Sequence, residues 1–597
     1  MEQPFHLGIC MAGAVTAGSY TAGAMDYILE TMERWQQQKD ANKAAAATGA
    51  ALPYPDTPMH NVVIEIVAGA SAGGMCAVIT SAMLAEGFTV DELANKKSKM
   101  YKAWIELDDE QEEEGTIKKM LDTGDIEKNG IVSLLNSQPL TRISEKAVYN
   151  LEQTKLPAYV SKHLDTLLTI ANLRGTRYGI EFKTNAGIKK HLMTLHRDFM
   201  HFKLNTTAGP TSDFLELNYA NALHVDLLRK SAVATGAFPI GLEPRPLTRN
   251  ARYYYNKADA TIGLSDPVMR DTVYVQRGND NNYHSLNIDG GTFNNEPFGE
   301  TERILNARAG KKHGEDISYN KTNRTTIMID PFPSEEDFPD TDDLKTGLNH
   351  VAPRIVAALR SQSSFKVPDL IDAYGDNNYL KFLIIPVKSG RKQPLCCATV
   401  GAFGGFFYKA FREHDYQLGR RNAQLFLRKH FTMPYSENEE NNNAIHRGWS
   451  KNMVDKYKDV VDGKTYLPII PDVRINDAGS EVPSPALPVY PLHKLKELEK
   501  PLAKRVDAML NAAEKFTSGD PEKPKSALAE EWFRKNAAQR FFGSLGGFIG
   551  KPFVWIIMRS IKKKIRDAAV KGAVTWIIED LNDAGLLGDS KFEIHNS

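Results

Sequence analysis

Two apolar stretches near the start of the chain each end in a cluster of small residues and lead directly into a helix-like segment. Residues 6–15 precede the segment 20–35, and residues 62–70 precede the segment 74–84. A short apolar run that ends at glycine is typical of a buried strand, and its alternation with helices predicts an α/β sheet. This repeated strand–turn–helix pattern constrains the fold more than any other feature of the sequence.

Further strand candidates extend the predicted sheet, and a change in composition marks its end. We expect strands at residues 167–173, 178–184, 199–204, 284–289, 325–330 and 379–387, a polar loop within 36–51, mostly helix in 88–165, and a long helix at 405–430. After Met433 the sequence turns to the polar run SENEENNNAIHRG and then to a proline-rich stretch. We therefore predict a first domain at 1–433 and a mostly helical accessory region at 434–597.

Composition excludes several classes of protein. Lys and Arg together number 74, as do Asp and Glu, so the zero net charge gives no reason to expect a nucleic-acid partner. The four cysteines have no zinc-site spacing and are too few for a disulfide framework, so we expect no metal and a cytoplasmic location. The N-terminus lacks a basic region before its apolar stretch, and no uninterrupted apolar run is long enough to predict a membrane-spanning helix.

The sequence Gly69-Ala70-Ser71-Ala72-Gly73 matches the G-x-S-x-G motif of a nucleophilic serine. The motif lies between a predicted strand and a predicted helix, which is the context that its chemistry requires. A sharp turn there lifts the Ser71 hydroxyl clear of the sheet, and Gly69 and Gly73 make room for it. The N–H of Ala72 would then donate to an oxyanion. The alternative is a tight glycine turn in which the serine is incidental.

A second small-residue loop follows the first strand, at Gly13, Ala14, Val15 and the residues up to 18. Backbone N–H groups at such a helix start form an anion site without any charged side chain, so this loop can complete an oxyanion hole. A dinucleotide site is the competing interpretation, but the G-x-G-x-x-G spacing is absent. Close packing of strand and helix would also account for the small residues.

A serine hydroxyl needs a base, and the segment Asn287-Ile288-Asp289-Gly290-Gly291 offers one at the end of a predicted strand. Gly290 and Gly291 would let the backbone approach closely around the Asp289 carboxylate. No histidine has comparable surroundings, and His284 on the same strand is expected to be structural. An ordinary Asp-Gly turn is the alternative for these residues.

Four segments in this order resemble the patatin-like phospholipase family: GSYTAGAM (18–25), GASAG around Ser71, SAVATGAFPIGLEP (231–244) and DGG at Asp289. SLLNSQPL (133–140) also resembles the family, and FREHDYQLGRRNAQ (411–424) is similar to a large bacterial subgroup of it. The resemblance implies a three-layer α/β/α core that hydrolyses fatty-acyl esters of phospholipids or related lipids. It implies Ser71 as nucleophile and Asp289 as base, with no cofactor.

The resemblance also places the oxyanion hole at Gly13, Ala14 and Val15, where this sequence departs from the family. The usual loop is Gly-Gly-Gly-x-Arg/Lys-Gly, and here Ala14, Val15 and Ala17 replace two glycines and the basic residue. Backbone N–H donors survive any side chain except proline, so the hole can persist. Loss of the cation lowers the positive potential near an anionic intermediate, so the loop supports activity on some acyl ester more strongly than activity on a charged phospholipid.

The segment 541–571 combines aromatic residues with a basic cluster. From Lys551 to Lys571 it holds seven basic residues and one acidic residue, net +6, and Ile557, Ile561 and Ile565 recur every four residues. This pattern predicts contact with an anionic lipid surface and peripheral association with the inner membrane. A core helix with solvated lysines is the alternative.

Two other functions compete with the lipid acyl hydrolase. A Ser-His-Asp esterase of the α/β-hydrolase class needs an acid and then a histidine after the serine, and no such signature is present. A pseudo-hydrolase that binds lipid or a partner protein would fit the altered glycine loop, but not the retained Ser71 and Asp289.

Overall fold

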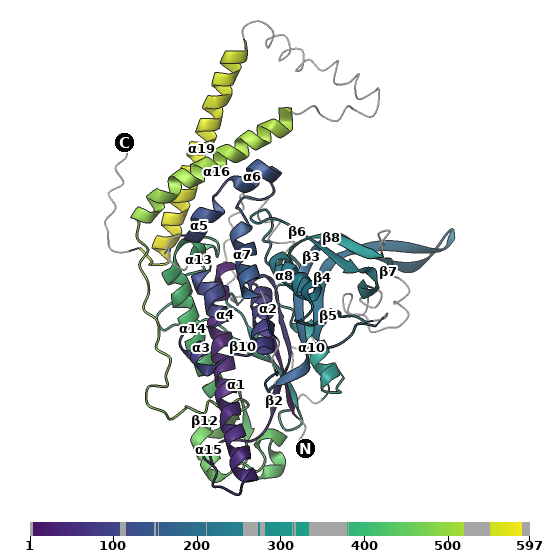
Figure 1. Ribbon diagram of the computed structural model, residues 1–597, viewed down its shortest axis with the longest axis vertical. Helices are drawn as coiled ribbons and strands as arrows, with labels where there is room; N and C mark the ends of the chain where they lie inside the picture. Colours follow the sequence, from purple (N-terminus) through teal and green to yellow (C-terminus); the bar gives the residue numbers. More distant parts are fainter. Residues whose placement is uncertain are drawn as a thin grey trace. The chain divides into compact units, whose positions relative to one another are not determined.

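The computed structural model describes residues 4–107, 115–148, 151–152, 155–209, 212–254, 273–274, 281–312, 315, 318–333, 379, 381–518 and 550–587. These residues form a mixed α/β structure with a parallel central sheet, as the strand–turn–helix pattern predicts (Figure 1). The strands of the larger sheet are β1 (Phe5–Met11), β2 (Val62–Gly69), β3 (Val160–Thr184), β4 (Gly187–Leu204), β5 (Leu215–Leu217), β6 (Arg245–Asn250), β7 (Val273–Tyr274), β8 (Asn282–Asp289), β9 (Arg324–Ile329) and β10 (Lys381–Ile384).

The centre of this sheet runs in the order β10-β9-β1-β2-β3-β4-β5. Strands β10, β9, β1, β2 and the start of β3 are parallel, and Ile9 of β1 lies between Val67 of β2 and Ile327 of β9. These three side chains are fully buried, as expected for a parallel strand that is covered on both faces. The two strands expected at 167–173 and 178–184 are one continuous strand, because β3 runs through both and pairs with β4 along its length.

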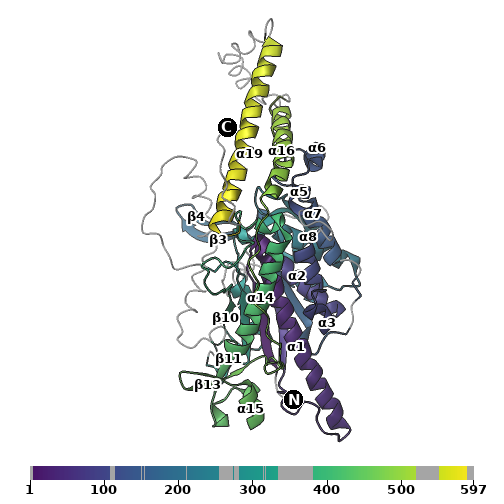
Figure 2. The same cartoon turned by 90° about the vertical axis from the view of Figure 1, so that its left-hand side faces the viewer.

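Helices cover both sides of the sheet, with α1 (Gly18–Ala47), α2 (Ser71–Glu86) and α14 (Lys409–Lys429) on one side and α10 (Phe298–Arg308) on the other (Figure 1). Figure 2 shows α1 and α14 side by side. They approach closely because each presents a glycine: a Cβ on Gly23 would overlap the backbone of Tyr416, and a Cβ on Gly419 would overlap that of Tyr20.

Helix α1 is longer than the sequence suggested, because it continues to Ala47 where the end of a helix and a polar loop were expected within residues 36–51. Polar residues of this extension are buried and hydrogen-bonded: Lys39 donates to the carbonyl of His60 (3.2 Å), and Asn42 donates to that of Tyr54 (2.7 Å). These long-range contacts, which no local pattern reveals, stabilise the additional turns.

Apart from short 3-10 turns, the remaining helices of the described residues are short or lie late in the chain. They are α3 (Val90–Ala94), α4 (Lys99–Tyr101), the π-helical turn η2 (Lys102–Glu106), α5 (Gly115–Met120), α6 (Gly124–Asn129), α7 (Gln138–Ala147), α8 (Ala222–Thr235), α13 (Gly404–Phe407), α15 (Lys451–Tyr457), α16 (His493–Ser518) and α19 (Gly550–Asp583). The chain divides into two compact units: 1–113, 140–239 and 244–488 form the first, and 114–139, 240–243 and 489–597 form the second.

The domain boundary expected after Met433 lies inside the first unit. Beyond that residue, β11 (Thr432–Tyr435), β12 (Asp459–Val461) and β13 (Lys464–Pro468) form a small antiparallel sheet whose Leu467 packs on Trp449 and Tyr457. The polar run between them is not a free linker, because the buried Asn443 side chain donates to the carbonyl of Thr322 (2.7 Å).

The second unit is helical, as expected for the C-terminal region, but it also contains an earlier part of the chain. Helix α16 packs against α19 and against α6, and the buried Arg505 of α16 forms two 2.9 Å bonds with the Asp125 carboxylate. Of the segment 541–571 that was predicted to contact membranes, residues 541–549 lie outside the described residues and the rest belongs to α19. Within the part of the chain that the structure describes, no helix is long and apolar enough to cross a membrane.

Candidate active site

Ser71 occupies a strained turn between β2 and α2. Its φ of +49° lies in the left-handed region, which costs energy for any residue with a side chain. The two glycines of the motif are required by space: a Cβ on Gly73 would overlap the carbonyl of Met11, and a Cβ on Gly69 would overlap the backbone of Gly73. The turn therefore holds Ser71 as the first residue of α2, at the end of a buried parallel strand.

Asp289 is the last residue of β8, and its side chain lies beside Ser71. Its Oδ2 accepts a hydrogen bond from the Ser71 Oγ at 2.6 Å, and its Oδ1 accepts one from the N–H of Gly291 at 2.7 Å. Gly290 allows this strand end to lie against β3, because a Cβ there would overlap the backbone of Thr169. Ser71 and Asp289 are both buried, so the carboxylate is fixed beside the hydroxyl with little access for solvent.

The segment 231–244 accepts backbone hydrogen bonds from both Ser71 and Asp289. The sequence did not assign this role to individual residues. Thr235 Oγ1 accepts the hydrogen bond of the Ser71 backbone N–H (2.9 Å), and the carbonyl of Ala237 accepts that of the Asp289 N–H (2.9 Å). The only signal in the sequence was that this segment is one of the four that carry the family resemblance.

The histidines that could compete for the role of base lie elsewhere. His6 bonds to Glu65 (2.8 Å), His60 to the carbonyl of Ile469 (2.9 Å), and His284 to Thr248 Oγ1 (2.9 Å). The Ser71 hydroxyl meets the Asp289 carboxylate directly, without an imidazole between them.

The loop at residues 13–15 lies against Ser71. A Cβ on Gly13 would come within 3.0 Å of the Ser71 Cβ and would overlap Asn295 Oδ1. The Gly13 N–H donates to the carbonyl of Asn295 (3.2 Å), so this predicted oxyanion donor is already engaged. The N–H groups of Ala14 and Val15 make no hydrogen bond within the described part of the chain.

Ala72 supplies another N–H beside the serine. It is the second residue of α2, and the first N–H groups of a helix have no acceptor within that helix. The positive end of the helix dipole also favours negative charge at this position. Ala72 therefore offers a donor directly after Ser71, and Ala14 and Val15 offer donors in the loop whose Gly13 lies against Ser71.

A distant part of the chain fixes the conformation of this loop. Thr16 binds the carbonyl of Ala402 through both its N–H (3.1 Å) and its Oγ1 (2.7 Å), and the same Oγ1 accepts from the N–H of Gly405 (3.0 Å). We call residues 396–405 the supporting segment. Asp415 of α14 anchors its first residues, because its two carboxylate oxygens accept the N–H groups of Cys396 and Cys397, each at 2.9 Å.

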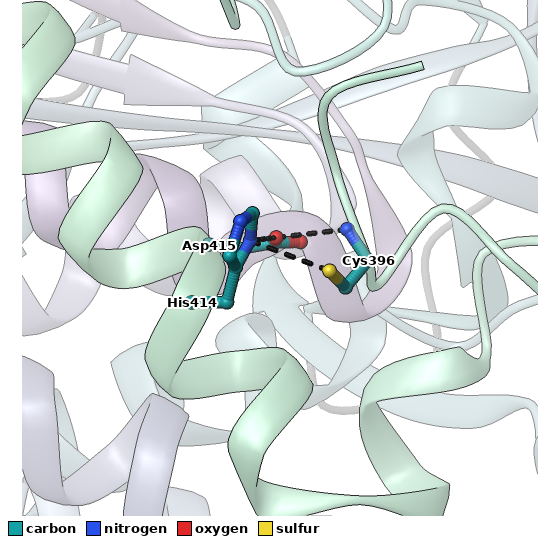
Figure 3. A group of neighbouring side chains, drawn as sticks. All are labelled: Cys396, His414 and Asp415. Atoms are coloured by element: carbon teal, nitrogen blue, oxygen red, sulfur yellow. Dashed lines mark hydrogen bonds and ion pairs between the residues drawn. The ribbon is translucent and has the colours of Figure 1, made fainter. Parts of the chain in front are cut away.

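The buried side chains of Cys396, His414 and Asp415 lie close enough together to be considered as metal ligands (Figure 3). Lys388 Nζ, which can only donate when charged, lies 2.8 Å from His414 Nε2, so Nε2 is an acceptor and Nδ1 carries the proton. Nδ1 can then donate to Asp415 Oδ1 at 2.8 Å. Burial raises the pKa of the Cys396 thiol well above its usual value, which disfavours the thiolate that a metal prefers.

A metal ion at this cluster would therefore have to displace a proton from Nδ1 and compete for an oxygen that holds the supporting segment. The geometry is that of a hydrogen-bonded chain from Lys388 through His414 to Asp415. It is connected to the loop at residues 13–15 through the supporting segment and Thr16.

Comparison with known proteins finds a relative whose function is not described. No family model matches the sequence. The chain is 30% identical over 536 residues to the uncharacterized protein y4iI of Sinorhizobium fredii (strain NBRC 101917 / NGR234), an overlap that covers 81% of this chain and 72% of that protein. The name of this relative assigns no reaction, so the chemistry has to be inferred from the site itself.

Proposed function

We propose that this chain, which belongs to the same protein family as y4iI, is a serine acyl hydrolase of the patatin-like type that cleaves fatty-acyl esters of lipids. The observation that carries the proposal is the 2.6 Å hydrogen bond from Ser71 Oγ to Asp289 Oδ2. A buried carboxylate in direct contact with a serine in a strained turn provides the nucleophile and its base in one pair.

The fold supports the patatin-like assignment. The sheet has helices on both sides, Ser71 follows the carboxyl end of a parallel strand, and the segment 231–244 binds both members of the pair. We therefore interpret the first unit as a three-layer α/β/α hydrolase core. Ligands of α/β sheets bind at this edge, where the loops after the strands converge.

In the proposed reaction, Asp289 accepts the proton of Ser71 as the Oγ attacks the ester carbonyl carbon. The C–O double bond opens to a tetrahedral oxyanion, which the N–H groups of Ala14, Val15 and Ala72 would stabilise. The proton passes to the departing alcohol, leaving an acyl group on Ser71. Water, deprotonated by Asp289, then releases the fatty acid and restores the serine.

The direct Ser–Asp contact favours this mechanism over a Ser-His-Asp triad, in which an imidazole would stand between the two side chains. It also favours an enzyme over a pseudo-hydrolase, since a binding protein has no need of a strained serine. The four cysteines, all buried free thiols, support the expected cytoplasmic location.

The test uses turnover of a p-nitrophenyl acyl ester and covalent labelling with a fluorophosphonate. Ser71→Ala is expected to abolish both while leaving the melting temperature close to that of the parent. Ser81→Ala is a matched control on the same helix, because its Oγ bonds to the Tyr219 hydroxyl (2.9 Å) and not to a carboxylate. Labelling of the Ser71→Ala variant at the parent level would contradict the proposal.

A further inference from the structure

A ribbon of β3 and β4, to which the short β7 adds at Arg177 and Tyr178, leaves the sheet at the edge that carries the candidate site. Strand β2 ends at Gly69, which pairs with Leu168 of β3, and Asp289 pairs with Ile170 of the same strand. Strand β3 then continues to Thr184 and returns as β4, pairing Thr176 with Leu195 and Thr184 with Gly187. We call residues 176–195 the hairpin; Figure 1 shows it as a ribbon extending away from the rest of the sheet.

The start of the hairpin has a defined conformation that hydrogen bonds stabilise. The register shifts between Ala171 and Thr176, and the buried Asn172 Oδ1 accepts the N–H groups of Arg174 (3.1 Å) and Gly175 (3.0 Å) there. Gly175 has a φ of +73°, which a glycine adopts without strain. This bulge sets the direction in which the hairpin leaves the sheet.

The hairpin exposes large apolar side chains, in contrast to the part of the same strands within the sheet. Phe182 is 50% exposed, Ile188 65%, Leu192 52% and Met193 41%. Single exposed apolar residues are common on protein surfaces, but four along one short ribbon indicate an interaction site.

Basic side chains lie among these apolar ones on both faces of the ribbon. Because paired residues share a face, Phe182 lies with Lys189, and Ile188 lies with Lys183. The Phe182 ring also contacts the His191 ring, with centroids 6.0 Å apart. In sequence, residues 176–195 hold four basic residues and one acidic residue, net +3.

We propose that the hairpin is the surface by which this protein docks on an anionic lipid surface. The boundary between headgroups and acyl chains accepts apolar and basic side chains together, and it surrounds an inserted ribbon on both faces. The net charge of +3 complements anionic headgroups. The choice of lipid as the occupant rests on the proposed function, and the hairpin would bring the site toward its substrate because both lie at the same edge of the sheet.

The test is sedimentation of the full chain with vesicles of phosphatidylcholine alone or mixed with phosphatidylserine, at low and high salt. All variants carry Ser71→Ala, so that binding is read without turnover and remains informative if the proposed function is wrong. We expect salt-dependent sedimentation with the mixed vesicles only. Replacing Lys183 and Lys189 by Gln should lower binding about fivefold for each charge.

The decisive variant replaces Phe182, Ile188 and Leu192 by Ser, which should abolish vesicle binding and leave the melting temperature unchanged. The matched control replaces Val460 and Val461 by Ser, since these residues of the β12–β13 hairpin are similarly exposed (57% and 48%). This control should bind like the parent.

Three results would overturn the proposal. The first is a parent chain that does not sediment with the mixed vesicles. The second is a triple serine variant that binds as well as the parent, which would place the lipid contact elsewhere, for instance on α19. The third is a parent that forms dimers in gel filtration while the triple variant is monomeric, because the hairpin would then dock on a second copy.

Discussion

Thr16 and Ala402 lie 386 residues apart in the chain and are joined by two hydrogen bonds, one from the Thr16 N–H and one from its hydroxyl. Thr16 directly follows Val15, so its position fixes the loop that is proposed to stabilise the oxyanion. The supporting segment is therefore part of the proposed active site, although the hydrogen bonds that Ser71 donates among the described residues go to Thr235 and Asp289 and not to this segment.

Replacing Thr16 by Val removes the hydroxyl while keeping the shape of the side chain. The N–H of Gly405 then loses its acceptor, and the loop loses one of its two bonds to Ala402. We expect kcat for an acyl ester to fall about tenfold or more, because small displacements of oxyanion donors are costly. Thr16→Ser retains the hydroxyl and should recover most of the activity. Equal rates for both variants would show that this bond does not position the loop.

Asp415→Asn tests the anchor of the supporting segment. The carboxylate accepts the buried N–H groups of Cys396 and Cys397, whereas an amide presents only one oxygen, so one N–H is left without an acceptor. This should lower the free energy of unfolding by about 1–3 kcal/mol. It should also reduce kcat in the manner of Thr16→Val.

The control for Asp415 is Asp455→Asn, which breaks only the exposed pair with Lys458. Urea unfolding and ester turnover of this variant should match the parent. Parent-like stability of Asp415→Asn would instead indicate that the supporting segment holds its conformation without the carboxylate.

A third prediction concerns the dependence of stability on pH. Burial raises the pKa of Asp26 to about 6, although hydrogen bonds from Ser98 and Tyr416 oppose the rise. The folded chain therefore holds a proton that the unfolded chain, with its Asp pKa near 3.9, releases. The stabilisation from this proton is complete below about pH 3.9 and is lost as the pH rises through about 6. Over this range the contribution of Asp26 to the free energy of unfolding should fall by about 3 kcal/mol.

Asp26→Asn removes this titration. The free energy of unfolding of the parent, minus that of Asp26→Asn, should therefore decrease between about pH 4 and about pH 7. Urea unfolding of both proteins across this range measures the difference directly. A difference that stays constant with pH would mean that Asp26 does not titrate there.

The sequence predicted the strands and turns of the site because their signals are local. The runs that end at Gly69 and Asp289 are strands, the first buried and the second alternating between buried and exposed residues. Backbone contacts require Gly73 and Gly290, the glycines that follow them. The bond between Ser71 and Asp289, 218 residues apart, has no local signal: the strand end offered Asp289 as a candidate base, and the family resemblance paired it with Ser71.

What the sequence could not predict depends on contacts between distant segments. The polar run after Met433 resembles a linker, but Asn443 is buried against the carbonyl of Thr322, and the division of the chain lies later. The supporting segment has no motif of its own, because its positive-φ residues Val400 and Ala402 are ordinary in sequence. Only the fold brings it to Thr16.

The most direct test of the proposed mechanism is ester turnover by Asp289→Asn. The amide keeps the shape and the bond to the Gly291 N–H but cannot accept the serine proton, so kcat should fall by about 10²-fold or more with little change in melting temperature. His284→Gln, on the same strand, should retain activity near that of the parent. Turnover by Asp289→Asn at the parent rate, or a His284→Gln variant as inactive as Asp289→Asn, would contradict the Ser71–Asp289 mechanism.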